Sequence, residues 1–250
     1  MNRNPSTLPS VTSQPQHIGL GRPTGKQAKH RVSKIGRLVP ISGAWLDIGC
    51  GAGDYAALLL DRGCDTVAAC DWQAYDEWAE LDRKGLTFAK APAESLPFED
   101  ETFDGILLNE VLEHVADERK TLAEARRVLK RQGHLVLFSP NRWFPFEGHG
   151  AKFGHHEVGF PVPFLPWLPK RLGNRWMNAR NYWPGELRLL VTGAGFEPSY
   201  EGFAYPLFQE YPWLPASMAR AVRSAAPRLE ETPGIRRLGV SILIIAQPVS

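Results

Sequence analysis

A short apolar run followed by three closely spaced glycines is the feature that most constrains this chain. Residues 44–48 are Ala-Trp-Leu-Asp-Ile, and Gly49-Cys-Gly-Ala-Gly53 follows directly. Residues 55–62 have the apolar content of a helix that Gly63 would end. Glycine lets the backbone turn sharply and approach a ligand, and the first turn of a helix offers unpaired amide hydrogens. The segment therefore predicts a strand, a ligand-binding turn and a helix.

Strands and helices are predicted to alternate through some hundred residues, up to residue 138, and further elements follow after residue 184. The expected strands cover residues 66–70, 86–90, 105–108, 134–138, 196–203 and 239–246, and the expected helices cover residues 29–38, 75–84, 118–131 and 186–193. Such alternation is typical of an α/β protein with a mostly parallel sheet and helices on both faces. With 250 residues and 43% apolar residues, residues 29–250 have the size and composition of one domain.

Residues 141–184 interrupt the alternation. They hold four of the eight tryptophans, three of the seven histidines and six prolines. This composition predicts a folded, aromatic-rich insertion after the fifth strand that caps the acceptor site. An apolar cap would suit an aromatic or lipid-like acceptor. The alternative, to which we give equal weight, is that the segment only adds a layer to the hydrophobic core.

Charge is spread unevenly along the chain. The first 40 residues carry seven basic residues and no acid, whereas the remaining 210 residues sum to −5. Residues 1–28 predict a disordered basic tail, either a solvated leader or an arm for nucleic acid or anionic lipid. An organelle-targeting segment has the same composition.

Two features that the sequence lacks indicate where in the cell the protein is found. The longest aliphatic stretch, residues 240–246, is too short to span a bilayer. The three cysteines form no closely spaced pair, which indicates a reducing compartment. We therefore expect a cytoplasmic protein without a transmembrane segment, for which peripheral membrane contact remains open.

The acids around the glycine turn indicate the class of ligand. A dinucleotide fingerprint would need glycine where the chain has Asp54, and no phosphate-loop Gly-Lys-Ser or Gly-Lys-Thr is present. Asp47 would repel a phosphate and attract a cation. Asp71 follows Gly53 by 18 residues, at the end of the second strand, where it could accept ribose hydroxyls. The pattern favours a cationic nucleoside over the alternative that both acids only cap turns.

Seven motifs, in order and at ordinary spacings, resemble class I S-adenosylmethionine-dependent methyltransferases of the type 11 and ubiquinone-pathway O-methyltransferase kind. They are Leu46-Asp-Ile-Gly-Cys-Gly-Ala-Gly53, Asp71, Ala93-Glu-Ser-Leu-Pro-Phe98, Phe103-Asp-Gly-Ile106, Val111-Leu-Glu-His-Val115, Leu122-x-Glu-x-x-Arg-Val-Leu129 and Gly133-x-Leu135. The resemblance implies a Rossmann-like, seven-stranded sheet whose last strand is antiparallel. It also implies S-adenosylmethionine as donor and S-adenosylhomocysteine as product.

The same resemblance implies roles for individual residues. The methionine part of the donor would lie against Asp47, Gly49, Cys50, Gly51 and Gly53. Asp71 would bind the ribose, Trp72 would lie against the adenine, and Ala93 and Glu94 would border the adenine edge. Asn109 would offer its backbone near the sulfonium.

Acids and an imidazole recur at helical spacing after the fourth strand. Glu110, Glu113, His114 and Asp117 stand at i, i+3, i+4 and i+7, which predicts one face of a helix. An ordinary solvent face is the alternative. The Glu-x-x-Glu-His pattern resembles that of ubiquinone-pathway O-methyltransferases and small-RNA 2′-O-methyltransferases. This resemblance implies Mg²⁺ or Mn²⁺ at Glu110, Glu113 and His114.

A hydroxyl acceptor must lose a proton during methyl transfer, which requires a base or a metal ion. Glu110, His114, His149 and His155 are the candidate catalytic residues, and His156 is a neighbouring option. We predict an S-adenosylmethionine-dependent methyltransferase that acts on a hydroxyl oxygen of a small or lipid-like acceptor. RNA 2′-O-methylation and a non-catalytic S-adenosylmethionine-binding regulatory subunit are the alternatives.

Overall fold

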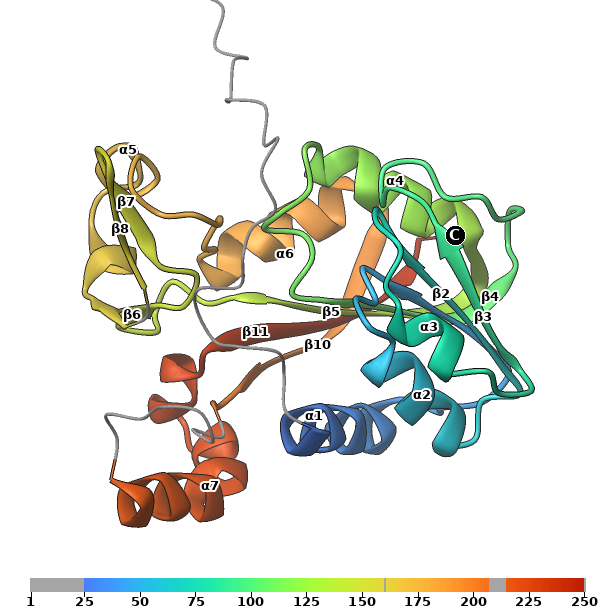
Figure 1. Cartoon of the computed structure of the whole chain (residues 1–250), viewed down its shortest axis with the longest axis horizontal. Helices are drawn as coiled ribbons and strands as arrows, with labels where there is room; N and C mark the ends of the chain where they lie inside the picture. The colour runs from blue at the N-terminus through green and yellow to red at the C-terminus, as the bar shows by residue number, and fades with distance from the viewer. Residues whose placement is uncertain (1–24, 160, 207–214, 250) are drawn as a thin grey trace, which may run out of the picture.

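A seven-stranded sheet runs through the centre of the computed structural model, which describes residues 25–159, 161–206 and 215–249 (Figure 1). The strand order is β10-β11-β5-β4-β1-β2-β3. The strands are β1 (Ala44–Ile48), β2 (Thr66–Asp71), β3 (Leu86–Lys90), β4 (Phe103–Asn109), β5 (Leu129–Pro140), β10 (Phe196–Ala204) and β11 (Ser241–Pro248). Strands β1 to β5 pair in parallel, and β11 is antiparallel to both of its neighbours, β5 and β10. The predicted Rossmann-like sheet with an antiparallel last strand is confirmed.

Helices cover both faces of this sheet, as predicted. Helices α1 (Gly25–Leu38) and α2 (Asp54–Asp61) lie on one face, and α4 (Glu118–Val128) and α6 (Pro184–Gly193) lie on the other (Figure 1). Successive residues of β4 supply the two cores, because Ile106 and Leu108 pack with α4 and α6 whereas Leu107 packs with α1 and α2. Burial of both faces explains why the central strands are almost wholly apolar.

A separate group of short elements follows the carboxyl end of β5, at the left in Figure 1. We call residues 141–183 the insertion lobe. The lobe comprises β6 (Phe146–Glu147), β7 (Ala151–Phe153), β8 (His156–Val158), β9 (Val162–Pro163), the 3-10 helix η1 (Leu165–Trp167) and α5 (Lys170–Gly173). Strand β6 pairs with β9, and β7 pairs with β8, in two small antiparallel sheets. The lobe thus stands at the edge of the sheet where the parallel strands end.

Several predicted boundaries differ from the structure. The helix expected over residues 75–84 is the single turn α3 (Glu77–Glu80), and α4 ends three residues early because β5 begins at Leu129. A long helix, α7 (Ala216–Glu231), and the 3-10 helix η2 (Ile235–Leu238) occupy a stretch for which only a proline-rich piece was expected. Most of the predicted basic tail, residues 1–24, lies outside the described residues. Within the described residues, no helix combines the length and apolarity needed to cross a membrane.

Candidate functional site

The glycine turn after β1 is bonded to the end of β2. The amides of Gly49 and Cys50 donate to the Cys70 carbonyl at 2.8 and 3.0 Å, and the Gly51 amide donates to Asp71 Oδ2 at 2.9 Å. The Trp78 indole also donates to the Gly51 carbonyl, at 2.7 Å. The turn and Asp71 therefore lie side by side where β1 and β2 end, as the sequence predicted.

Asp47 lies beneath this turn and is 2% exposed. Its carboxyl accepts a hydrogen bond from the Ala56 amide, while Oδ2 has no partner among the described residues. Burial, and secondarily the charge of Asp71, raise the pKa of Asp47 to about 8. Two buried carboxyls so close together favour a cation as their ligand.

The residues expected around the adenine lie along the neighbouring edge. The Trp72 side chain is 57% exposed, which leaves its ring available for stacking. Ala93 packs against the core, and Glu94 Oε1 accepts hydrogen bonds from the amides of Ala116 and Asp117, at 2.8 and 3.3 Å. Glu94 thus connects the loop after β3 to the turn before α4. Its role at the edge of the adenine stays a prediction.

Two residues at the end of β4 are held by Arg31 of α1. Arg31 Nη1 donates to Asn109 Oδ1 at 2.6 Å and lies 2.9 Å from Glu110 Oε1. The Ser241 hydroxyl also donates to Glu110. Burial alone would raise the pKa of Glu110, but the charge of Arg31 and the bond from Ser241 lower it below its usual range. Glu110 is therefore an ionised carboxylate whose Oε1 is paired with Arg31 and with Ser241.

The expected helical face over residues 110–117 is wrong. Glu110 has a φ of 57°, and residues 111–117 form turns rather than a helix. Asp117 caps α4 instead, because its Oδ1 accepts from the amides of Arg119 and Lys120 at 3.0 Å each. Because Asp117 is the N-cap, α4 begins only at Glu118. Glu110, Glu113, His114 and Asp117 therefore do not lie on one face of a helix.

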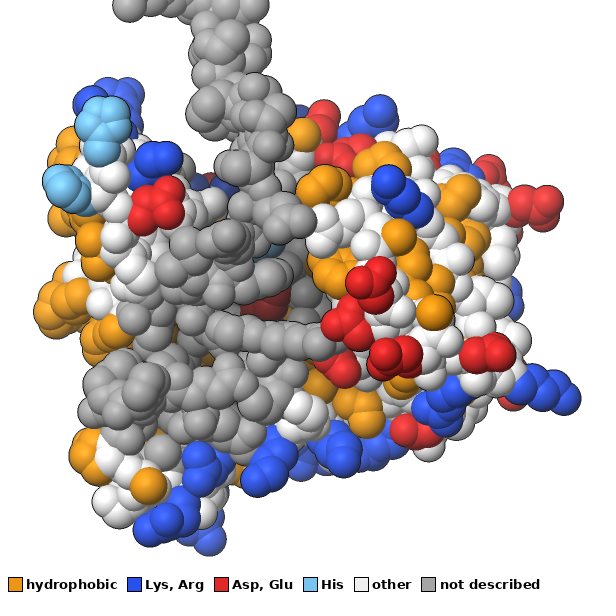
Figure 2. All heavy atoms as spheres, in the orientation of Figure 1, with side chains coloured by type: hydrophobic (Ala, Val, Ile, Leu, Met, Phe, Trp, Pro, Cys, Tyr) orange, Lys and Arg blue, Asp and Glu red, His pale blue; other side chains and the backbone are white. Residues whose placement is uncertain are grey.

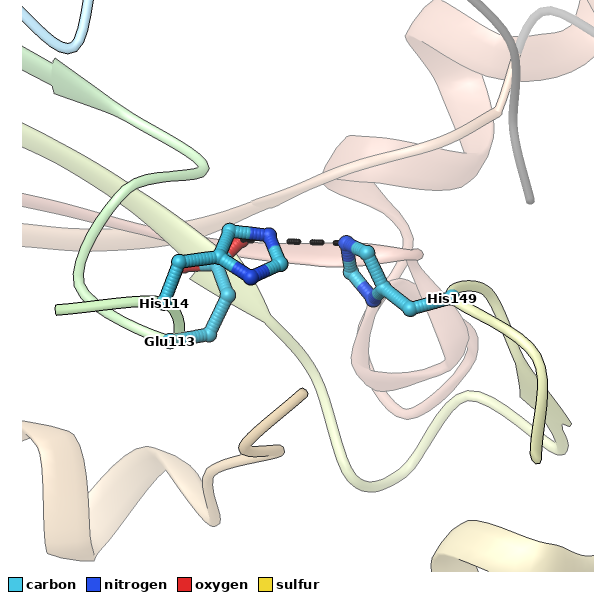
Figure 3. Close-up of side chains that lie close together, drawn as sticks. All are labelled: Glu113, His114 and His149. Atoms are coloured by element: carbon cyan, nitrogen blue, oxygen red, sulfur yellow. Dashed lines mark ion pairs between the residues drawn. The ribbon is translucent and has the colours of Figure 1, made fainter. Parts of the chain in front are cut away.

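Glu113, His114 and His149 form a close cluster where this turn meets the insertion lobe (Figure 3). One ligand atom from each side chain lies within 4.8 Å of the other two. Glu113 Oε1 is 3.9 Å from His114 Nε2 and 4.0 Å from His149 Nε2, and the two imidazole rings meet edge to face at 4.9 Å. Of the predicted metal set, Glu113 and His114 are in the cluster, whereas Glu110 is paired with Arg31.

Glu113 is the most unusual group of the cluster. It is 3% exposed, and neither carboxyl oxygen has a hydrogen-bond partner among the described residues. Burial first, and the charge of Glu110 second, hold the pKa of Glu113 well above its usual range. An orphaned buried carboxyl beside two imidazoles fits either a shared proton or a metal ion.

The other two candidate histidines are not brought to this place. His155 and His156 are exposed at the turn of the β7–β8 hairpin. Only His149, among the three histidines of the lobe, contacts the cluster residues.

The lobe also holds the turn that carries Glu113. Arg180 Nη1 donates to the Val115 carbonyl at 2.7 Å, and the Tyr182 hydroxyl is 3.2 Å from the Leu112 carbonyl. These two contacts hold residues 112–115 at both ends of the segment. The position of Glu113 and His114 therefore depends on residues some 65 positions later in the chain.

Sequence reasoning missed the residues that hold the site, namely Arg31, Ser241, Arg180 and Tyr182. Arg31 left one signal, since it shares a helical face with the apolar Ala28, Val32 and Ile35. A basic residue on an apolar stripe implies a buried partner. The other three left no pattern that local spacing could reveal.

Comparisons with known proteins find that this chain is similar to methyltransferases. Residues 46–137 match the family model described as a methyltransferase domain. The ubiquinone biosynthesis O-methyltransferase of Dinoroseobacter shibae is 33% identical over 172 residues, which are 66% of this chain and 65% of that protein. The demethylmenaquinone methyltransferase of Clavibacter sepedonicus is 33% identical over 120 residues, or 45% of this chain and 48% of that one.

The fold is also found among solved structures. An S-adenosylmethionine-dependent methyltransferase from Mesorhizobium loti superposes with a TM-score of 0.56 at 17% identity, covering 90% of this chain and 98% of that chain. The chain spans less than two thirds of the length of the curated relatives described above.

Proposed function

We propose that this chain, whose residues 46–137 form a class I methyltransferase domain, transfers a methyl group from S-adenosylmethionine to a hydroxyl oxygen of a small or lipid-like acceptor. The observation that carries the proposal is the pair of buried carboxyls, Asp47 and Asp71, on either side of the glycine turn. A sulfonium nucleoside is cationic and carries two ribose hydroxyls, so it matches both features of this place.

The roles of the remaining donor-binding residues are those that the resemblance implies, and their positions support them. The backbone of Gly49, Cys50, Gly51 and Gly53 would face the methionine part, and Asp71 would accept the ribose hydroxyls. Trp72 would stack on the adenine, with Ala93 and Glu94 at its edge. Asn109 would place its backbone near the sulfonium, because it ends the central strand β4 at the same sheet edge.

A quinone-type acceptor is the substrate class that these observations favour. Two relatives of this chain are named for ubiquinone and demethylmenaquinone. The insertion lobe stands beside Glu113 and His114 and is rich in aromatic residues, which suits an aromatic acceptor that is largely apolar. The lobe would then cap the acceptor site.

The cluster of Glu113, His114 and His149 would take up the proton of the acceptor hydroxyl. An imidazole is a base near neutral pH, and the buried Glu113 could share the proton with either histidine. Glu110 is occupied by Arg31 and Ser241, so it would position the turn, and the exposed His155 would take no part.

The same three residues would also fit a divalent ion. Glu113, His114 and His149 offer one carboxylate and two imidazoles, a set that suits Mn²⁺ better than Mg²⁺, which prefers oxygen ligands. A bound ion would supply Lewis acidity that makes a hydroxyl easier to deprotonate.

The outer surface of the insertion lobe would contact membranes. Phe164, Trp167 and Leu172 are 59%, 45% and 51% exposed, and the exposed Arg171 and Arg175 lie close to them in the chain. Figure 2 shows apolar side chains along the left-hand edge of the molecule, where the lobe lies in Figure 1. Aromatic and basic side chains together match an anionic lipid surface, on which a lipid-like acceptor would be found.

The proposal is tested by calorimetry with S-adenosylmethionine and by transfer of a labelled methyl group to simple catechols and hydroxyquinols. Asp71→Asn should weaken donor binding roughly 10- to 150-fold, since charge-assisted hydrogen bonds contribute about 1.5 to 3 kcal/mol. Asp65→Asn, at the opposite end of β2, is the matched control and should bind normally. Binding without transfer to any acceptor in a cell extract would favour a regulatory subunit, and labelling of RNA alone would favour RNA 2′-O-methylation.

A further inference from the structure

A second buried carboxylate, Glu147, lies behind His149. Glu147 is in β6, opposite Val162 of β9, and is fully buried. Its Oε2 accepts a hydrogen bond from Asn181 Nδ2 at 2.6 Å, and its Oε1 accepts one from the His149 amide at 2.8 Å. Glu147 is thus fixed by two donors before the imidazole is considered.

The two nitrogens of the His149 ring face different carboxyls. Nδ1 lies 3.4 Å from Glu147 Oε1, whereas Nε2 lies 4.0 Å from Glu113 Oε1. Nδ1 is buried and has no hydrogen-bond partner among the described residues, so Glu147 is the acceptor within reach. A small rotation of the ring would complete that bond.

The loop that carries His149 is also held by its backbone. Asn178 Nδ2 donates to the His149 carbonyl at 3.0 Å. Gly150 follows at a φ of 75°, and a Cβ there would lie 2.6 Å from the Val158 carbonyl oxygen. The loop therefore has little freedom to present the imidazole in another orientation.

We infer that Glu147 is a positioning residue that keeps the His149 proton on Nδ1, so that the lone pair of Nε2 faces Glu113 and the acceptor. An ionised carboxylate can only accept a hydrogen bond, so it favours the tautomer with a proton on the nitrogen nearest to it. A bare Nε2 is what either role of His149 requires, because both a general base and a metal ligand use the lone pair. For its effect on activity the inference rests on the proposed function, but the tautomer does not.

Glu147→Gln tests the tautomer directly. Glutamine has the same shape, and when its oxygen accepts from Asn181 Nδ2 its NH₂ group takes the place of Oε1, which faces Nδ1. Its NH₂ group can then donate to Nδ1, which favours the tautomer with the proton on Nε2. In ¹⁵N-histidine NMR spectra, with the signals of His149 assigned by their loss in His149→Gln, we expect Nδ1–H in the wild type and Nε2–H in Glu147→Gln.

Two variants separate positioning from folding. Glu157→Gln, on the exposed face of the same lobe, should leave the His149 tautomer and methyl transfer unchanged. Glu147→Asp retains the charge and should restore the wild-type tautomer and part of the activity, even if it lowers the thermal stability.

Kinetics complete the test. Loss of a residue that orients a ligand or base typically costs 10- to 100-fold, so we expect kcat of Glu147→Gln to fall roughly that much while donor affinity stays within about twofold. An unchanged tautomer or an unchanged kcat in Glu147→Gln overturns the inference. A wild-type protein that transfers no methyl group overturns the proposed function alone, because the NMR result stands without it.

Discussion

Arg31 and Glu110 form a partly buried ion pair between the first described helix and the turn after β4. The guanidinium Nη1 lies 2.9 Å from Glu110 Oε1, and Arg31 is 3% exposed. Arg31 Nη2 also donates to the Ser241 hydroxyl at 2.6 Å, and the guanidinium lies 4.8 Å from the centre of the Phe138 ring. One side chain therefore joins α1, the candidate site and β11.

Removing this arginine should destabilise the whole fold. Arg31→Met would leave the partly exposed Glu110 carboxylate without its charged partner and would remove the guanidinium bonds to Asn109 and Ser241, which should cost about 1 to 3 kcal/mol. Arg37→Met, on the exposed side of α1, should change the free energy of unfolding by less than about 0.5 kcal/mol. Urea denaturation of both variants measures the difference, and equal midpoints would show that the pair contributes little.

The pH dependence of stability provides a second measure of the same pair. Because Arg31 lowers the pKa of Glu110 in the folded protein, the resulting stability is present above the unfolded pKa and is lost as the pH falls through the folded pKa. Wild-type stability should therefore decrease on acidification below about pH 4.5. This contribution should be absent from Arg31→Met.

Donor binding should release a proton from Asp47. The pKa of this carboxyl is about 8, and a cationic ligand beside it would favour the ionised form and lower that pKa. Affinity should thus rise with pH up to about 8. Calorimetry in buffers of different ionisation enthalpy should detect proton release that is absent from Asp47→Asn and retained in Asp65→Asn.

Asp47 should also make the folded protein less stable at higher pH. Its raised pKa means that the folded state keeps a proton which the unfolded chain releases, so stability is lost as the pH rises from about 4 to 8. Asp47→Asn should unfold at higher urea concentration than the wild type at pH 8, although it binds the donor less well. An unchanged midpoint would contradict the assigned protonation.

Two glycines of the turn should respond differently to alanine. Gly51 has a φ of 52°, but a Cβ there would meet open space, so Gly51→Ala should cost only the left-handed backbone penalty of about 1 to 2 kcal/mol. At Gly49, with a φ of 71°, a Cβ would lie 2.4 Å from Val111 Cγ2. Thermal unfolding should show the larger loss for Gly49→Ala, with partial recovery when Val111→Ala is added. Equal losses would mean that Val111 moves aside freely.

A metal ion at the cluster can be distinguished from a proton relay. If Glu113, His114 and His149 hold Mn²⁺, electron paramagnetic resonance should show tight binding that weakens at least tenfold in Glu113→Gln. His155→Ala, at the exposed hairpin, should bind as the wild type does. Methyl transfer that withstands a chelator, together with no Mn²⁺ binding, would leave the histidines as bases without a metal.

Vesicles test the surface of the insertion lobe. The wild type should bind phosphatidylglycerol vesicles at low salt and bind phosphatidylcholine vesicles weakly. Replacing both Arg171 and Arg175 by glutamate should weaken binding at least tenfold, since each basic residue near an anionic surface contributes about 1 kcal/mol. Trp167→Ser should also weaken it, whereas Leu189→Ser, at an exposed position of α6, should not. Equal binding by all variants would exclude this surface.

The proposed donor-binding residues were predictable because residues near them in the sequence determine their positions. The strand, glycine turn and helix between Ala44 and Asp61 are set by neighbouring residues, and Asp71 ends the adjacent strand in the expected place. Parallel alternation then fixed which strand ends meet, and this placed Asp47 and Asp71 together. No contact from distant residues was needed to find them.

The acceptor side was less predictable because distant residues shape it. The polar spacing at residues 110–117 imitates a helix, but the positive φ of Glu110 is supported by Arg31, and Asp117 satisfies the first amides of α4. His149 could be proposed from composition, but not preferred over His155, since only the folded lobe separates them. Helix α7 was missed because it contains Pro227, a residue that ordinarily ends a helix.

The contacts of Arg180 and Tyr182 with residues 112–115 limit how the proposed acceptor site could be changed. An insertion lobe taken from a relative would carry its own residues over the proposed acceptor site. It would leave the Leu112 and Val115 carbonyls without their hydrogen-bond donors. The histidine and carboxyl on that turn would then lose their alignment before any substrate arrived. Chimeras should therefore exchange the lobe and the turn as one unit, and a lobe transplanted alone should fold yet remain inactive until matching residues at 180 and 182 are restored.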